Sequence, residues 1–119
     1  MTLFIRSYFG DYILELNDFQ ELCTTTAVYP KDIGIEYCAL GLVSEVGEVA
    51  GKMKKFLRGD FALDVLIDGM YKELGDVLWY VAMLAEELDV PLDDLAAVVL
   101  SKLQARKAAG TIQGDGDNR

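Results

Sequence analysis

Apolar residues recur every three or four positions through most of this chain, with polar residues between them. This is the spacing of helices that bury one face, and no stretch shows the alternation that is typical of a strand. The pattern predicts four helices, over about residues 17–26, 35–57, 64–88 and 89–110. Because a short connector joins the two long helices, they should lie antiparallel in an all-α helical bundle.

The expected helix ends coincide with residues that favour a start or a stop. Asn17 or Asp18 is the expected N-cap of the first helix, and Pro30 prevents that helix from continuing. Gly59 suits the position after the second helix, because glycine readily adopts a positive φ. Pro91 falls near the first turn of the fourth helix, which Gly110 ends.

We expect a single domain over residues 1–119. Residues 1–14 are predicted to form an arm, and residues 111–119 a polar, glycine-rich tail that is disordered by default. Arg6 and Asp11 interrupt the apolar start, which is untypical of a signal peptide. No apolar run approaches the ~20 residues of a membrane span. We therefore expect a cytoplasmic protein that does not bind membranes.

Composition narrows the chemistry. The chain has 20 acidic and 11 basic residues and a net charge of −9, which argues against binding of a nucleic-acid polymer. A phosphorylated ligand remains compatible, because divalent cations can reverse the local charge. Histidine is absent, which excludes Ser–His and Cys–His catalysis and histidine zinc sites. The two cysteines, Cys23 and Cys38, form no Cys-x-x-Cys pair and are expected to be buried free thiols.

Two pairs of carboxylates interrupt the apolar pattern of the long helices. Glu45 and Glu48 belong to the second helix, and Glu73 and Asp76 to the third. The i, i+3 spacing places the members of each pair on one helix face. One interpretation of the first pair is a solvated face, on which Glu48 and Lys52 at i, i+4 contribute ~0.3 kcal/mol.

The third helix favours another interpretation. Between residues 74 and 85 the only charged residue is Asp76, and apolar residues surround the axis, as in a buried helix. A buried carboxylate is costly unless it is paired or binds a metal ion. If the two long helices face each other, the four carboxylates converge and require cations. Oxygen ligands suit Mg²⁺, with Mn²⁺ as a substitute, and Lys52 and Lys55 nearby suit a di- or triphosphate.

The two acidic pairs also resemble a known signature. Glu-x-x-Glu, then 24 residues, then Glu-x-x-Asp is similar to the metal motif of the MazG-like all-α nucleoside triphosphate pyrophosphohydrolases. The stretches ALGLVSEVGEVAGKMKK, KELGDVLWYVAMLA and KLQARKAAGTIQGDGDNR resemble that family too, so the resemblance covers about residues 15–119. It implies a homodimer or homotetramer that cuts nucleoside triphosphates between the α- and β-phosphates. The reaction would depend on Mg²⁺ and give a nucleoside monophosphate and pyrophosphate.

The resemblance implies residue roles as well. The metal ions would be bound by all four carboxylates, Glu45, Glu48, Glu73 and Asp76. Glu45 or Glu48 would also be catalytic, and we favour Glu45 to orient or deprotonate the attacking water. Contacts to the substrate are expected from Lys52, Lys55, Tyr80, Lys102, Arg106 and Arg119. Many relatives carry an asparagine shortly before the Lys-Leu of the last helix. Here Val99 and Ser101 stand in that segment, so a polar contact is missing or is supplied by Ser101.

Aromatic residues admit two interpretations. They can stack on the base of a nucleotide or pack in the core or a subunit interface, and the candidates are Phe19, Tyr29, Tyr37 and Trp79. Tyr29 and Phe19 are the better candidates for the base, since relatives use the region of the N-terminal helix in the nucleoside pocket. Glycines within the second helix indicate close helix packing or room for a ligand, at Gly41, Gly47 and Gly51.

Two other functions compete with the pyrophosphohydrolase. Prenyl-diphosphate enzymes also carry paired acids on facing helices, but their motifs are different and their chains much longer. The other alternative is a non-catalytic module, either for helical oligomerisation or for nucleotide-binding regulation.

Overall fold

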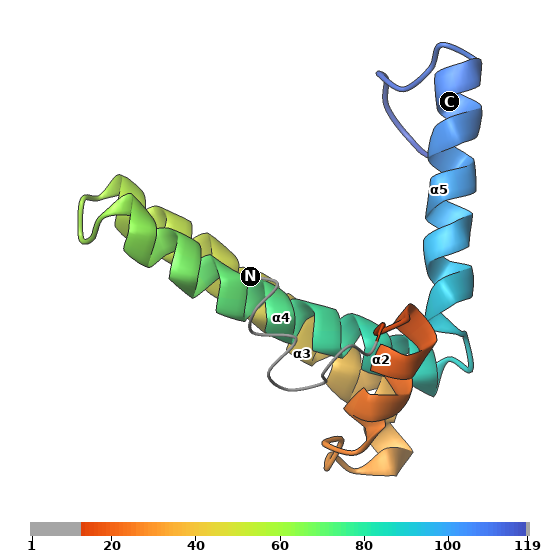
Figure 1. Ribbon diagram of the computed structural model, residues 1–119, viewed down its shortest axis with the longest axis horizontal. Coiled ribbons are helices and arrows are strands. Elements are labelled where there is room, and N and C mark those ends of the chain that lie inside the picture. Colours follow the sequence, from red (N-terminus) through yellow and green to blue (C-terminus); the bar gives the residue numbers. More distant parts are fainter. Residues whose placement is uncertain (1–12, 119) are drawn as a thin grey trace.

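The computed structural model describes residues 13–118, which form four α-helices and one short 3₁₀ helix (Figure 1). These are α2 (Leu16–Thr24), η1 (Lys31–Ile33), α3 (Gly34–Leu57), α4 (Leu63–Glu87) and α5 (Leu92–Ala108). This part of the chain contains no strand, so the predicted all-α fold is confirmed. None of its helices is long and apolar enough to cross a membrane. The arm predicted over residues 1–14 lies almost wholly outside the described residues.

Helices α3 and α4 form an antiparallel hairpin, as predicted (Figure 1). The hairpin turn begins at Gly59, whose φ of 87° lies in the left-handed region that glycine adopts without strain. The backbone N–H of Gly59 donates to the carbonyl of Phe56 at 2.9 Å, and that of Asp60 donates to Lys55 at 3.1 Å. These bonds satisfy carbonyls at the end of α3 that have no partner within the helix.

Helix α2 lies across the end of the hairpin opposite its turn, which we call the open end (Figure 1). It packs against both α4 and α5. Asn17, an expected N-cap of α2, instead accepts a hydrogen bond from the backbone N–H of Asp93 at 3.0 Å. The Gln20 side chain accepts from the N–H of Leu92 at 2.8 Å and donates to the carbonyl of Val90 at 3.0 Å. The polar side chains of α2 therefore cap the start of α5 rather than their own helix.

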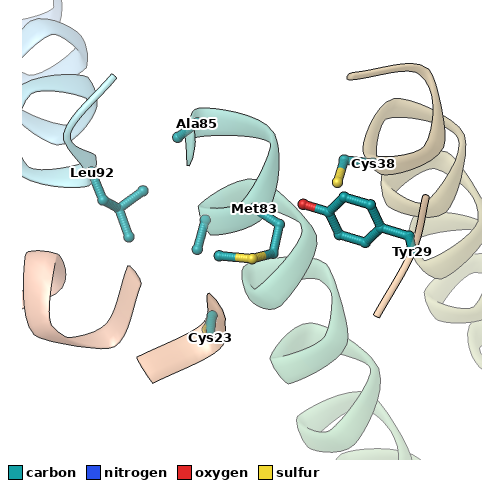
Figure 2. Packing of buried hydrophobic residues seen from close by; sticks show 7 residues of the cluster. Cys23, Tyr29, Cys38, Met83, Ala85 and Leu92 are labelled. Carbon is teal, nitrogen blue, oxygen red and sulfur yellow. The ribbon is translucent and has the colours of Figure 1, made fainter. Parts of the chain in front are cut away.

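The buried core lies at the open end of the hairpin, where α2, α3, α4 and the start of α5 meet (Figure 2). Met83 and Cys38 are its largest fully buried side chains. Cys23 and Cys38 are buried free thiols, as predicted, and burial raises the pKa of Cys23 to about 11. The side chains of this cluster are Cys23, Tyr29, Cys38, Ala82, Met83, Ala85 and Leu92.

The prediction that α4 is buried on all sides is wrong for a single copy of the chain. Leu74 is 56% exposed and Leu78 is 44% exposed, because α3 and α2 cover only part of the circumference of α4. With Ile67 and Tyr71 they form one apolar stripe along the uncovered face. Helix α5 projects away from the hairpin and exposes apolar side chains of its own (Figure 1).

The C-terminal tail turns back beside α5 (Figure 1). Gly110, with a φ of 71°, begins the reversal after the last helical turn. The Arg106 guanidinium then donates to the backbone carbonyl of Asp117 at 2.9 Å and to its carboxylate at 3.0 Å. The ammonium of Lys102 lies 3.4 Å from the same carboxylate. Two basic residues of α5 thus hold the described end of the tail.

Candidate metal centre

Three of the four predicted carboxylates meet across the hairpin. Glu45 on α3 and Glu73 and Asp76 on α4 each offer one oxygen, and these oxygens lie within 4.8 Å of one another. Glu45 and Glu73 are half-buried, whereas Asp76 is exposed. The fourth residue, Glu48, is exposed and does not belong to this group. We call Glu45, Glu73 and Asp76 the carboxylate cluster.

The cluster is unfavourable for the protein alone. The pKa of Glu45 is raised, first by loss of hydration and then by the negative charges of Asp76, Glu73 and Glu48. Like charges at this separation disfavour ionisation of all of them together. The ligand set contains only oxygen, which suits a hard divalent cation such as Mg²⁺ or Mn²⁺. The residues present therefore fit such an ion.

Lys52 approaches the cluster from the side of the hairpin turn. Its ammonium lies 3.3 Å from Oε1 of Glu73, and it forms no ion pair with Glu48, the partner expected from i, i+4 spacing. Gly69 explains the difference, because a Cβ there would lie 3.1 Å from Cδ and 3.2 Å from Cε of Lys52. The absence of a side chain at this position of α4 leaves a path for Lys52 to reach across to Glu73.

Lys55, the second basic residue expected near the substrate, lies closer to the hairpin turn. The pKa of Asp60 is lowered mainly by its hydrogen bond from Arg58, and the charge of Lys55 lowers it further. The structure therefore places Lys55 beside the acidic residue of the turn rather than with Lys52.

Tyr80 lies on the other side of the cluster, toward the open end. Its ring occupies the space above Gly41, where a Cβ would overlap it, so close packing is the reason for glycine at this position. Gly47 and Gly51 have open space instead. Burial raises the pKa of Tyr80, and the neighbouring Tyr37 and Glu45 raise it further.

Two pockets adjoin the cluster, and Glu45 and Tyr80 line both of them. The first has a volume of about 350 Å³ and is lined by Thr26, Glu45, Asp76, Trp79 and Tyr80. The second has a volume of about 300 Å³ and is lined by Tyr37, Leu40, Gly41, Ser44, Glu45 and Tyr80. Both pockets include Glu45, so a ligand in either one reaches the carboxylates.

The aromatic residues favoured for a base contact belong to the core. Tyr29 is 7% exposed, stacks on Tyr37 at 5.1 Å between ring centroids, and donates a hydrogen bond to Glu87. Phe19 packs against the same core. Of the four candidates, Trp79 and Tyr37 line the pockets beside the cluster. The sequence did not single out Thr26 or Gly69, because their importance depends on contacts between helices.

The remaining predicted substrate contacts lie elsewhere. Lys102 and Arg106 belong to α5, which projects away from the hairpin, and both contact Asp117 (Figure 1). Arg106 is largely buried, and its Nε has no hydrogen-bond partner within the described residues. Arg119 lies outside the described residues. A single copy of the chain therefore does not bring the basic residues of α5 to the carboxylate cluster.

The fold and the cluster define an all-α protein with a candidate site for divalent cations on a helical hairpin. Residues 34–110 match the family model of the MazG nucleotide pyrophosphohydrolase domain, and the chain belongs to this family. It is 44% identical over 117 residues to the Gene 37 protein of Mycobacterium phage L5. That match covers 89% of this chain and 100% of the phage protein. No solved structure shows a significant match.

Proposed function

We propose that the protein is a Mg²⁺-dependent nucleoside triphosphate pyrophosphohydrolase. It would cut NTPs or dNTPs between the α- and β-phosphates and release a nucleoside monophosphate and pyrophosphate. The observation that carries this proposal is the carboxylate cluster, whose three oxygens lie within 4.8 Å of one another on two facing helices. Membership of the MazG family supports the reaction class. A cytoplasmic location, where such substrates occur, follows from the proposal.

Glu45, Glu73 and Asp76 would hold the cations, and Glu48 on the next turn of α3 would complete the ligand set. Bound divalent cations would shield the phosphate charge, lower the pKa of water and stabilise the departing pyrophosphate. This leaves the protein mainly with positioning and charge stabilisation, as in other phosphoryl-transfer enzymes. The absence of histidine is compatible with such chemistry.

Glu45 is the proposed general base. Its pKa is raised in the metal-free protein and would fall once cations neutralise the neighbouring carboxylates, so this role rests on the position of the carboxylate. Glu45 lines both pockets, which places its carboxylate beside any ligand that fills them. Tyr80, which lines both pockets, would donate a hydrogen bond from its hydroxyl to a phosphate oxygen.

Lys52 is the proposed contact for the terminal phosphates. Its ammonium pairs with Glu73, so Lys52 would lose this partner if Glu73 held a cation. A freed ammonium beside Glu73 would suit a phosphate oxygen. Lys55, near the hairpin turn, would also contact the terminal phosphates of the substrate.

We also propose that the protein functions as a homodimer or homotetramer. A contiguous exposed apolar stripe is unusual on a monomer and typical of an interface. Such a stripe runs along α4, and further apolar side chains are exposed on α5 at Leu95, Val98, Val99, Leu100 and Leu103. In an assembly, α5 of one copy would bring Lys102 and Arg106 toward the phosphates bound by another, and Arg119 is a further proposed contact. Sedimentation of the parent chain and of Leu74→Glu tests this, and a parent that sediments as a monomer would contradict it.

The experiment that tests the function is pyrophosphate release from a panel of NTPs and dNTPs, with Mg²⁺ and with EDTA. We expect turnover of at least one nucleotide with Mg²⁺ and none with EDTA. If every nucleotide binds without turnover, the protein is a nucleotide-binding regulatory module. If none binds, it is an oligomerisation module.

A further inference from the structure

Glu87 is the last residue of α4, where a negative charge is unfavourable for its own helix. The last turn of α4 contains no basic residue that would compensate it. The Glu87 side chain is nonetheless only 16% exposed, whereas the preceding residue, Glu86, is exposed. Contacts to other parts of the fold, rather than its own helix, therefore explain the position of Glu87.

Three residues from the start of α3 and the segment before it surround the Glu87 carboxylate. The hydroxyl of Tyr29 donates a hydrogen bond to it, and the ammonium of Lys31 lies 3.6 Å from its Oε1. Gly34, the first residue of α3, lies against the same carboxylate, because a Cβ there would overlap it. The N-cap of α3 is Ile33, which has no polar side chain, so a carboxylate beside the first turn also suits the helix dipole.

Tyr29 connects Glu87 to the aromatic side chains beside the carboxylate cluster. It is buried, and its hydroxyl points toward α4 (Figure 2). Its ring stacks on Tyr37 with centroids 5.1 Å apart and meets Trp79 edge to face at 6.5 Å. The ammonium of Lys31 lies 4.5 Å from the centroid of the same ring. The hydrogen bond to Glu87 therefore fixes the polar end of a ring whose faces and edge contact other side chains.

Tyr37 and Trp79 each line one of the two pockets that adjoin the carboxylate cluster. Trp79 also meets Tyr80, which lines both pockets, at 4.9 Å between ring centroids. Contacts between aromatic rings therefore lead from Glu87 to the edge of the cluster. Glu87 itself follows Asp76 by about three turns of α4, which is roughly 16 Å along the axis, so it lies out of reach of the carboxylate cluster.

We propose that Glu87 is a positioning residue for the site. By holding the Tyr29 hydroxyl, it fixes the aromatic walls of the two pockets beside the carboxylate cluster, and it binds neither cation nor substrate. This inference rests on the proposed function, because these walls affect the reaction only if the substrate occupies the pockets. Loss of the contact should weaken binding of the substrate and leave the cleavage step unchanged.

The first test measures the kinetics of Tyr29→Phe and Glu87→Met. Each variant removes the hydrogen bond and keeps most of the side-chain volume, so KM for the nucleoside triphosphate should rise about three- to tenfold, the factor of one hydrogen bond. The values of kcat and of the Mg²⁺ affinity should stay the same, because the carboxylate cluster is unchanged. The double variant should raise KM no further than either single variant, since both remove one contact.

Three controls separate positioning from a loss of stability. Glu87→Gln keeps an acceptor for the Tyr29 hydroxyl and should retain a KM close to that of the parent. Glu86→Met changes the neighbouring exposed glutamate and should leave KM unchanged. Leu92→Val removes part of a buried core side chain and should lower the melting temperature without changing KM. A KM that rises as much in Leu92→Val as in Glu87→Met would overturn the inference, because stability alone would then explain it.

The second test does not depend on turnover. Trp79 is the single tryptophan of the chain and is half-buried, so quenching of its fluorescence by acrylamide reports how firmly this wall is packed. In the ligand-free protein we expect stronger quenching in Tyr29→Phe and Glu87→Met than in the parent. Glu87→Gln and Glu86→Met should be quenched like the parent.

The outcomes separate this inference from the proposed function. A parent that cleaves nucleotides, with quenching and KM unchanged in Tyr29→Phe and Glu87→Met, would overturn the positioning role and leave the enzyme intact. A parent that cleaves no nucleotide would overturn the proposed function. Stronger quenching in the same two variants would still support the role of Glu87 in fixing the aromatic walls.

Discussion

Two groups of charged side chains in this protein each combine residues of one sign with a single residue of the opposite sign. In the hairpin, Lys52 pairs with Glu73, and the other two carboxylates of the cluster have no ion-pair partner within residues 13–118. On α5, a single carboxylate, that of Asp117, serves both Lys102 and Arg106. The first group has three carboxylates against one ammonium, whereas the second has two cations against one carboxylate.

The difference separates a candidate metal site from a pair of basic residues that the tail already contacts. An acidic cluster on facing helices reduces stability unless something binds it, and strongly perturbed carboxylates are typical of functional sites. An exposed ion pair such as that of Lys102 with Asp117 contributes little to stability. Substitutions in the hairpin should therefore change activity far more than substitutions in the tail.

The largest effect is expected for Glu45→Gln. This change removes a ligand charge and the proposed base but little volume, so pyrophosphate release should fall at least about 100-fold in a folded protein. The matched control is Glu36→Gln, which changes an exposed glutamate in the first turn of the same helix. Parental turnover in Glu45→Gln would exclude Glu45 from the site.

The same variant should change the pH dependence of stability. The folded state raises the pKa of Glu45 above its ordinary value of 4.5, so the folded protein binds this proton more tightly than the unfolded chain. The metal-free parent should therefore lose stability as the pH rises from the ordinary glutamate range through the raised pKa. Glu45→Gln should lose less, as measured by urea unfolding at a series of pH values. Equal losses would show that Glu45 is not perturbed.

Glu48→Gln tests whether Glu48 belongs to the metal ligands together with the carboxylate cluster. Glu48 lies outside the group of three, yet its charge contributes to the raised pKa of Glu45. We expect activity to fall at least about tenfold, less than for Glu45→Gln, if Glu48 completes the ligand set. Unchanged activity with unchanged Mg²⁺ affinity would remove Glu48 from the ligands.

Lys52→Met tests whether the Lys52 ammonium competes with a cation for the Glu73 carboxylate. Without the ammonium beside Glu73, the metal-free protein should bind Mg²⁺ about two- to fivefold more tightly and bind triphosphate more weakly. Calorimetric titration measures both, with Lys54→Met as the control on the same helix. Gly69→Ala should raise Mg²⁺ affinity less than Lys52→Met does, because it only crowds the Lys52 side chain. Gly75→Ala is its control and should leave Mg²⁺ affinity unchanged, because Gly75 has open space around it. Weaker Mg²⁺ binding in Lys52→Met would contradict the competition.

The smallest effect is expected for Asp117→Asn. Arg106 and then Lys102 lower the pKa of this carboxyl, so the contact exists above the ordinary aspartate range and is lost as the pH falls through the lowered pKa. Removing its charge frees two cations, and KM for triphosphate should fall by no more than about threefold. Asp115→Asn is the control. A loss of turnover in Asp117→Asn would show that the tail belongs to the active site.

The fold was predictable from the sequence where local signals decide it. The four helices and the antiparallel hairpin follow from apolar spacing, Gly59 and the short connector. The N-cap of α2 was not predictable, since Asn17 bonds to Asp93 on another helix. The exposure of α4 was not predictable either, because a helix with apolar residues on all sides can be covered by its own chain or by a second copy.

The candidate site was predictable in part for a similar reason. The i, i+3 spacing and the antiparallel pairing bring Glu45 to Glu73 and Asp76. The partner of Lys52 depends on a gap at Gly69 of the opposite helix, which spacing along one helix does not reveal. The pocket lined by Thr26 depends on where α2 ends relative to Trp79, and that is a tertiary contact.

The most direct test of the carboxylate cluster is the melting temperature of the metal-free protein with and without millimolar Mg²⁺. Binding to the folded state alone should raise it by about 4 °C or more, and EDTA should reverse the change. Glu73→Gln, which removes one charge from the cluster, should show little or no rise. A parent protein whose melting temperature responds to neither Mg²⁺ nor EDTA would contradict a cation site at Glu45, Glu73 and Asp76.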